Sequence, residues 1–231
     1  MKKGPAFLMF LCFSLLLVTP LVAQQGAPTP PPKVLQIFRE EVKPGKGAAH
    51  EKVEAGWPRA FAKANSPTHY TAMVSISGPS EAWFAAGFES FAAWEKDQKF
   101  NEGNAALQAE LNQLSAKDGE LLSNLRSIVA TYREDLSHRP GFSFPLTRYF
   151  SMTIVRIRPG HNLDFEESRK ISKAAHEKAG VKDNHSVWQV VSGMPNGTFL
   201  IITPMRSLAE MDATVQVHGK DFQYAVGDES R

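Results

Sequence analysis

The sequence predicts an α+β fold made of two tandem copies of one structural unit. When the chain is laid on itself at a shift of 115 residues, Val42 to Lys46 matches Ile157 to His161, a strand end followed by a Pro-Gly turn. The same shift aligns Ser77-Gly78 with Ser192-Gly193, and a shift two residues longer aligns residues 89–95 with residues 206–212. A match that keeps its register through several elements indicates a duplicated unit.

Hydrophobic patterns and turn residues predict the elements of each unit. Runs rich in β-branched and aromatic residues predict strands over residues 35–42, 70–77, 81–88 and 125–134 in the first copy and over 149–157, 186–191 and 198–203 in the second. Helices are expected over residues 46–64, 90–117 and 162–179, with a further one starting near residue 207. The order strand, helix, strand, strand, helix, strand is the ferredoxin-like arrangement.

Four residues of the second copy mark the ends of its elements. Asn162 is placed to cap the N-terminus of its helix, and Gly180 suits a left-handed stop at the other end. Asn196-Gly197 is a strong signal for a tight hairpin turn between the two strands that follow.

The repeat divides the chain into a first unit over residues 34–136, a linker over 137–146 and a second unit over 147–231. Too few residues follow Met211 for both a second helix and a last strand. Two explanations stay open. The sequence is a fragment that lacks the final strand of the second unit, or the unit is shorter and another chain completes its sheet.

The N-terminal segment has the order of a secretory signal. Lys2 and Lys3 precede an apolar run over residues 7–22 that ends at Ala23, which predicts a signal peptide over residues 1–23. We therefore expect an exported protein, periplasmic or extracellular, without membrane contact after cleavage; an uncleaved anchor is the alternative. Residues 24–33 are rich in proline and predict a flexible leader.

Composition excludes several functions. Without Lys2 and Lys3, basic and acidic side chains are equal in number, and no basic run follows, so we expect no nucleic-acid partner. The only cysteine, Cys12, lies inside the apolar run, so the exported chain has no thiol or disulfide. There is no glycine-rich phosphate loop and no Gly-x-Ser-x-Gly elbow, which disfavours nucleotide use and serine hydrolysis.

Histidines are the candidate catalytic residues, because imidazole transfers protons near neutral pH. We select His50, His176 and His218. The repeat aligns His50 with Phe165 and Phe61 with His176, so each first helix carries one His and one Phe at exchanged positions. The alternative is a buried His that bonds a backbone carbonyl. No metal site is expected, because neither HxxxH nor HxH spacing occurs.

The remaining candidates concern binding. His69, His138 and His185 stand beside turns or the linker and are expected to be solvated. At the shift of 115 residues Trp83 aligns with Thr198, which suggests that only one of the two clefts has an aromatic wall. Aromatic side chains offer large apolar area for a ligand, although core packing is the alternative for each. The ligand-binding candidates are Trp57, Trp83, Trp188 and Phe199.

Three segments carry a resemblance to a known superfamily: residues 158–161, residues 190–200 and residues 207–212. With the repeat, they resemble the tandem form of the dimeric α/β barrels, which include antibiotic-biosynthesis-type monooxygenases, NIPSNAP proteins and stress-responsive barrel proteins. The resemblance implies that the units pair within the chain or in a homodimer. Its members include cofactor-free oxygenases and haem enzymes. No cofactor is predicted, but the resemblance allows haem, with His218 near a cleft as its ligand.

Three functions remain open at this point. The first is an exported binding protein for a small apolar or aromatic molecule. The second is a monooxygenase-like oxidoreductase, either cofactor-independent or haem-dependent. The third is a structural or interaction module in which the barrel is only a stable core.

Overall fold

The computed structural model describes residues 28–212. The predicted signal peptide, His218 and the end of the second unit lie outside these residues. The first unit consists of β1 (Val34–Val42), α1 (Gly47–Glu54), α2 (Gly56–Lys63), β2 (Thr71–Val74), β3 (Glu81–Phe88), α3 (Phe91–Glu102), α4 (Ala105–Gly119) and β4 (Leu122–Tyr132). The second contains β5 (Tyr149–Arg156), α5 (Asn162–Lys178), β6 (Ser186–Ser192) and β7 (Thr198–Met205). Two short 3-10 turns, Glu134–Leu136 and Phe144–Leu146, lie between the units.

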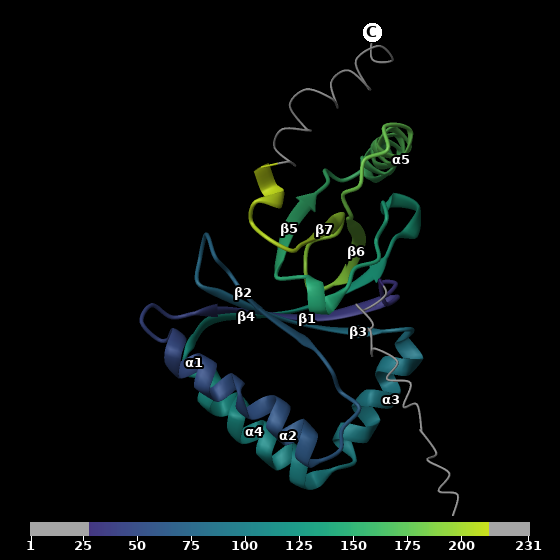
Figure 1. The fold of residues 1–231 in the computed structure, drawn as a ribbon. Helices are drawn as coiled ribbons and strands as arrows, with labels where there is room; N and C mark the ends of the chain where they lie inside the picture. The colour runs from purple at the N-terminus through teal and green to yellow at the C-terminus, as the bar shows by residue number, and fades with distance from the viewer. Residues whose placement is uncertain (1–27, 213–231) are drawn as a thin grey trace, which may run out of the picture.

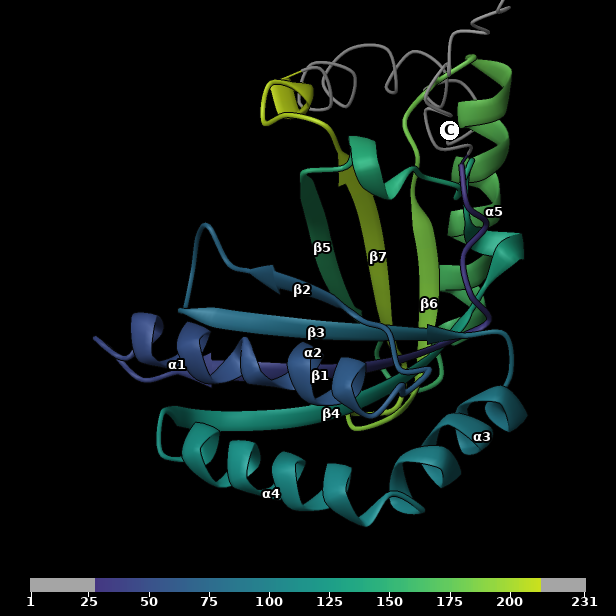
Figure 2. The same ribbon diagram turned by 60° about the horizontal axis from the view of Figure 1, so that its bottom comes forward.

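All strands belong to one seven-stranded sheet with the order β2-β3-β1-β4-β6-β7-β5. Every pairing is antiparallel, and the β4–β6 pair joins the two units within one chain. Figure 1 shows β5, β6 and β7 rising from one side of the layer formed by β1–β4, while α1, α2 and α4 lie on the other side. Figure 2 shows the same arrangement after rotation, with α5 beside β6. The two units thus face each other across the curled sheet.

Two apolar clusters occupy opposite faces of the sheet. The larger lies on the inner face, between the units, and includes Ile37, Ile128, Trp83, Trp188 and Leu200. The smaller lies beneath α5, where Val187 and Phe199 are fully buried and Phe165 packs against them. Burial of this much apolar surface is the main favourable contribution to folding.

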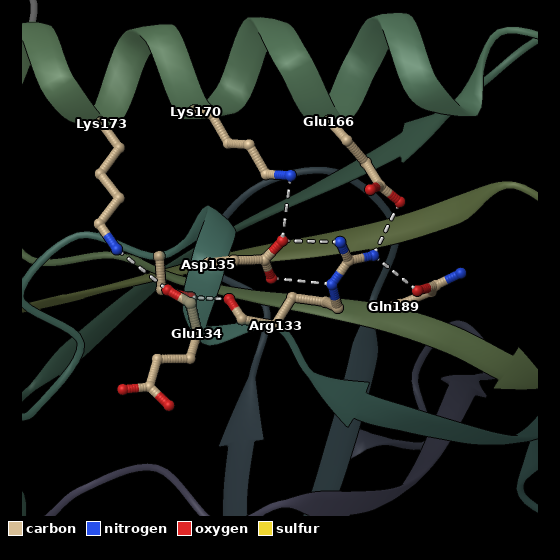
Figure 3. A network of polar contacts seen from close by, with 8 residues as sticks. Arg133, Glu134, Asp135, Glu166, Lys170, Lys173 and Gln189 are labelled. Atoms are coloured by element: carbon tan, nitrogen blue, oxygen red, sulfur yellow. Dashed lines mark hydrogen bonds and ion pairs between the residues drawn. The ribbon is translucent and has the colours of Figure 1, made fainter.

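An arginine at the end of β4 holds the seam between the units. The Arg133 guanidinium donates to Asp135 Oδ1 at 2.9 Å, to Glu166 Oε1 on α5 at 2.8 Å and to Gln189 Oε1 on β6 at 2.9 Å. Lys170 of α5 adds an ion pair with Asp135 at 3.7 Å. Figure 3 shows these side chains converging from α5, β6 and the turn after β4. Bidentate and charge-assisted bonds of this kind fix orientation more firmly than neutral ones.

The expected helices of the first unit are each divided in two. The helix predicted over residues 46–64 is interrupted at Ala55, because Pro58 has no N–H to donate to the carbonyl of Glu54. The helix predicted over residues 90–117 is interrupted after Gly103, and Asn104 caps the second part by accepting from the Leu107 N–H at 3.0 Å.

The turn residues give mixed outcomes. Gly180 and Gly197 adopt φ values of 65° and 76°, which confirms the predicted helix stop and hairpin turn. The prediction for Asn162 is wrong. It is the first residue inside α5, and His161 precedes the helix with its Nδ1 atom 2.7 Å from Asp164 Oδ2.

Strand register also corrects the alignment of Trp83 with Thr198. Trp83 pairs with Arg39, and Ile154, which lies 115 residues after Arg39, pairs with Leu200. Leu200 is therefore the counterpart of Trp83, and both belong to the inner core. The extra two residues of the second copy enter before β7 rather than after it.

The part of the predicted leader that the structure describes is packed against the sheet rather than free. The Lys33 N–H donates to the Phe88 carbonyl at 2.9 Å, and Thr29 forms a bridge with Phe142. A side chain at Gly87 would meet Pro32 Cγ at 2.6 Å, so Gly87 allows this close contact. Among residues 28–212, no helix has the length and apolar character needed to cross a bilayer.

Candidate functional site

A cavity of about 430 Å³ lies between the two units on the inner face of the sheet. Its walls come from β1, β2, β3, β5, β6 and β7 and from the segments around residues 29–32 and 142–144. Most lining side chains are apolar, including Leu35, Ile37, Met73, Trp83, Ala85, Phe144, Phe150, Met152, Trp188 and Ile202. This volume falls in the range of small-molecule pockets.

The two tryptophans of this cavity have their polar atoms satisfied by the protein. Trp83 Nε1 donates to Glu81 Oε2 at 2.9 Å, and Trp188 Nε1 donates to Ser186 Oγ at 2.9 Å. The Arg39 guanidinium also lies 5.0 Å from the Trp83 ring centroid. Since both indole N–H groups are occupied, the tryptophans offer the cavity apolar ring surface.

His69 and Tyr70 are neighbours in the sequence and both border the cavity. Neither was among the ligand-binding residues predicted from the sequence. His69 is exposed, which confirms the expectation for it, and Tyr70 is half-buried. Burial, together with the carboxyls of Glu54 and Glu40, raises the pKa of Tyr70 to about 12. Tyr70 therefore keeps its proton at neutral pH. Its ring lies beside those of Phe61 and Phe84, on the face of the sheet that the helices cover.

A second group of polar residues is buried on the outer face of the sheet, beneath α1 and α4. His50 Nε2 lies 2.8 Å from Glu40 Oε2 on β1 and 3.4 Å from Asp118 Oδ1 on α4. Glu54 stands one helical turn after His50 on α1. One potential ligand atom from each of these four residues lies within 4.8 Å of the others. We call them the acid–histidine cluster.

The surroundings of this cluster disfavour the ionised form of its carboxyls. Burial raises the pKa of Glu40 and of Asp118. Burial, with the Glu40 and Asp118 carboxyls beside it, raises the pKa of Glu54 to about 8. Glu54 Oε1 and Asp118 Oδ1 are both buried without a hydrogen-bond partner. The Trp57 indole lies near enough to Glu54 to lower its pKa slightly, but its Nε1 also lacks a partner with hydrogen-bond geometry.

The acid–histidine cluster has an apolar counterpart in the second unit. Glu40 pairs with Ala82 across β1 and β3, and Val155 pairs with Phe199 across β5 and β7. Phe165 stands at the place of His50, and its ring centroid lies 4.7 Å from that of Phe199. The same position between sheet and helix is thus polar in one unit and apolar in the other.

Three histidines gather in the second unit. The rings of His138, His176 and His185 have centroids 5.5 to 5.8 Å apart, and all three are buried. The expectation that His138 and His185 are solvated is therefore wrong, because the linker folds back and His138 pairs with His185 through the backbone. His176 Nδ1 donates to the Ser172 carbonyl at 2.6 Å, which is the structural alternative foreseen for it.

His176 and His185 also line a larger cavity of about 740 Å³ between α5 and strands β5 and β7. This cavity occupies the face that α4 covers in the first unit. Residues 210–212 correspond to the start of α3, and the residues that correspond to α4 lie outside the described part of the chain.

The structure separates the predicted ligand-binding residues. Trp83 and Trp188 meet at the central cavity. Phe199 lies on the opposite face, fully buried beneath α5. Trp57 lies on α2, and its ring centroid is 6.4 Å from that of Phe61. His50 lies in the acid–histidine cluster, and His218 is outside the described residues.

Haem does not fit His50, the candidate in the acid–histidine cluster. A haem ligand needs an imidazole nitrogen that faces a cavity. The Nε2 atom of His50 instead lies beneath the helices against two carboxyls. His176 lines the 740 Å³ cavity, with its Nδ1 atom bonded to the backbone. No step through haem is derived for these residues.

Solved structures share this fold at low sequence identity. A "Putative monooxygenase" from Fusobacterium nucleatum matches with TM-score 0.57 and 12% identity, covering 86% of this chain and 87% of that chain. A "putative monooxygenase" from Lactobacillus acidophilus matches with TM-score 0.52 and 8% identity, covering 85% and 88%. An anthrone oxidase-like protein matches with TM-score 0.52 and 10% identity, covering 84% of each chain.

Comparisons by sequence gave no match, either to a protein-family model or to a curated protein. The likeness is thus one of architecture, and it extends over both units. The chain therefore has the dimeric α/β-barrel fold, with its two ferredoxin-like units in a single polypeptide.

Proposed function

We propose that the protein is an exported barrel that binds a small, largely apolar, aromatic molecule in the cavity between its two units. The observation that carries the proposal is the pairing of Trp83 and Trp188, one from each unit, as walls of one 430 Å³ cavity. His69 and Thr71 supply the few polar groups that orient a ligand. A concave apolar site with a small number of polar groups is the usual form of a small-molecule pocket.

Two features support binding rather than simple core filling. The cavity has a volume of about 430 Å³ although Trp83 and Trp188 in its wall are buried, whereas protein interiors normally leave few voids larger than a water molecule. Both tryptophans are held by hydrogen bonds to Glu81 and Ser186, so their rings are oriented before a ligand arrives. Preorganisation of this kind lowers the entropy cost of binding.

The test uses a neutral aromatic probe and a pair of matched substitutions. N-phenyl-1-naphthylamine, whose fluorescence rises in apolar surroundings, is titrated into the wild-type protein and into Ala85→Phe, which fills the cavity. We expect saturable binding to the wild type and a loss of at least about tenfold in affinity, or 1.4 kcal/mol, in the variant.

Ala72→Phe is the matched control, because Ala72 lies on the neighbouring strand and is exposed. It should bind the probe like the wild type. Circular dichroism and thermal unfolding verify that both variants are folded, since overpacking costs about 1–3 kcal/mol. Absence of saturable binding to the wild type, or equal affinity in Ala85→Phe, would contradict the proposal.

Oxygenation is the second candidate, and His69 favours it. In a cofactor-independent reaction a base removes a proton from an activated aromatic carbon before oxygen reacts, and His69 is an ionisable side chain at the cavity wall. Oxygen uptake with anthrone tests this, because an anthrone oxidase-like protein shares the fold. His161→Ala is the control, because His161 is exposed and lies away from the cavity. Oxygen uptake that is lost in His69→Ala and kept in His161→Ala would favour an enzyme. Binding without uptake would leave a binding protein.

A further inference from the structure

The acid–histidine cluster beneath α1 and α4 has the donors and the geometry of a metal site. We propose that Glu40, His50, Glu54 and Asp118 together bind one divalent transition-metal cation, of the class of Zn²⁺ or Mn²⁺. This site is on the opposite face of the sheet from the aromatic cavity and does not depend on what that cavity binds. The ion would fasten β1, α1 and α4 to one another.

The donor set points to this class of ion. Three carboxyls supply oxygen and one imidazole supplies nitrogen, a mixture that suits first-row divalent metals better than Mg²⁺ or Ca²⁺, which prefer oxygen alone. The residues come from three elements, so their positions are fixed by the fold. His50 and Glu54 are four residues apart on α1, which places both on one helix face.

The distances are close to those of a coordinated ion. Two ligand atoms that each lie ~2.1 Å from one metal cannot be more than ~4.2 Å apart. The candidate ligand atoms here lie within 4.8 Å of one another, so the most distant of them would have to approach by roughly 0.6 Å. Small side-chain rotations provide this. Four protein ligands complete a tetrahedral shell, which is typical of structural sites.

Unsatisfied oxygen atoms provide independent support for a ligand. Asp118 is only 5% exposed, and its Oδ1 atom has no hydrogen-bond partner although it points at His50. Glu54 Oε1 is also buried and has no hydrogen-bond partner. No lysine or arginine within residues 28–212 forms an ion pair with these carboxyls. Buried polar atoms without partners are rare in native proteins and suggest a missing ion or water.

The duplicated unit shows that this polar arrangement is not required by the fold. At the matching place in the second unit, Val155, Phe165 and Phe199 pack as an ordinary apolar core. Burying three carboxyls in place of such a core is unfavourable unless a cation or protons neutralise them. Asp118 also lies in the last turn of α4, where the helix dipole disfavours an anion.

The test measures metal binding by the full-length protein after treatment with EDTA and removal of any affinity tag. Zn²⁺ and Mn²⁺ are titrated by calorimetry, with Mg²⁺ for comparison, and bound Mn²⁺ is followed by electron paramagnetic resonance. We expect one Zn²⁺ per chain and an increase in the melting temperature. Glu54→Gln and Asp118→Asn should each weaken binding by at least about 100-fold, the upper end of what loss of an outer-sphere partner costs.

Glu81→Gln is the matched control, because Glu81 is a carboxylate bound by Arg39 outside the cluster. It should bind Zn²⁺ like the wild type. Absence of stoichiometric Zn²⁺ or Mn²⁺ binding to folded wild-type protein would overturn the proposal. It would equally be overturned if Glu54→Gln and Asp118→Asn kept wild-type affinity, or if Mg²⁺ bound as tightly as Zn²⁺. An increase in melting temperature caused by Zn²⁺ in wild type and Glu81→Gln, but absent in Glu54→Gln, would support it.

Discussion

Glu40 and Val155 occupy the same place in the two units. Each is 115 residues from the other, and each lies on the first strand of its unit, opposite Ala82 and Phe199 respectively. The backbone is therefore the same at this place in both units, but the first unit has a hydrogen-bonded pair, Glu40 and His50, where the second has an apolar contact. The consequences of this exchange can be measured.

A double-mutant cycle on Glu40 and His50 tests whether they act as a pair. Glu40→Val and His50→Phe each install the residue of the second unit and leave the other partner without its bond. In EDTA-treated protein, the double variant should be less destabilised than the sum of the single variants by about 1–3 kcal/mol. Urea unfolding measures this coupling. Simple additivity would show that the 2.8 Å contact contributes nothing.

Gly193 and Gly78 form a matched pair for the seam between the units. Both adopt a positive φ, 84° for Gly193 and 81° for Gly78. A Cβ atom added at Gly193 would collide with Ser127 O of β4, whereas one added at Gly78 would meet nothing within 4 Å. Gly78→Ala should cost about 1–2 kcal/mol from backbone conformation alone. Gly193→Ala should cost a further ~1–3 kcal/mol from overpacking. Denaturant midpoints compare them, and equal losses would contradict the close approach.

Removal of Trp188 should weaken the core shared by the two units. Trp188 is buried in the inner cluster and bonds Ser186. Trp188→Ala should lower the free energy of unfolding by about 3–5 kcal/mol. Trp94→Ala is the comparison, since Trp94 is only half-buried on α3, and its cost should be clearly smaller. Chemical denaturation followed by far-UV circular dichroism gives both values.

The Arg133 network predicts a loss of stability in acid. Hydrogen bonds from Arg133 lower the pKa of Asp135 below 3.8 and the pKa of Glu166 below 4.5. Because the folded state holds these groups ionised, their contribution is present above the unfolded pKa values and is lost as the pH falls through the lowered ones. Urea midpoints should therefore decrease below about pH 4.5.

Glu166→Gln isolates the contribution of one carboxyl to this acid response. The decrease in midpoint between pH 4.5 and pH 3 should be smaller in Glu166→Gln than in the wild type. Glu102→Gln, at an exposed position at the end of α3, should keep the wild-type pH dependence. An identical pH dependence in all three proteins would exclude the Arg133 network as its cause.

Local patterns were sufficient to predict the strands and the repeat. The strand over residues 81–88 and the left-handed Gly180 and Gly197 follow from neighbouring residues alone. Periodicity alone does not predict the helix break, which depends on the missing N–H of Pro58. The burial of His138 could not be predicted, because the burial of a linker depends on which segments fold over it, and local sequence patterns do not give this.

The acid–histidine cluster could be predicted only in part from the sequence. The exchange of His50 for Phe165 was visible in the repeat, and the same comparison applied to Glu40 and Val155 would have indicated a polar group at a core position. Asp118 had no such signal, because its counterpart would fall beyond residue 231. The meeting of Trp83 with Trp188 depends on the β4–β6 pairing, which sequence patterns do not specify.

That β4–β6 pairing has a consequence for the order in which the chain acquires its structure. The first unit has all of β1 to β4 once residue 132 is available, so its half of the sheet can form before the second unit exists. Until β6 arrives, the outer side of β4 around residues 129–132 is an unpaired edge, the kind of surface at which strands of different molecules associate. Prompt docking of the second unit would therefore protect the nascent protein from aggregation as well as enclose its cavity.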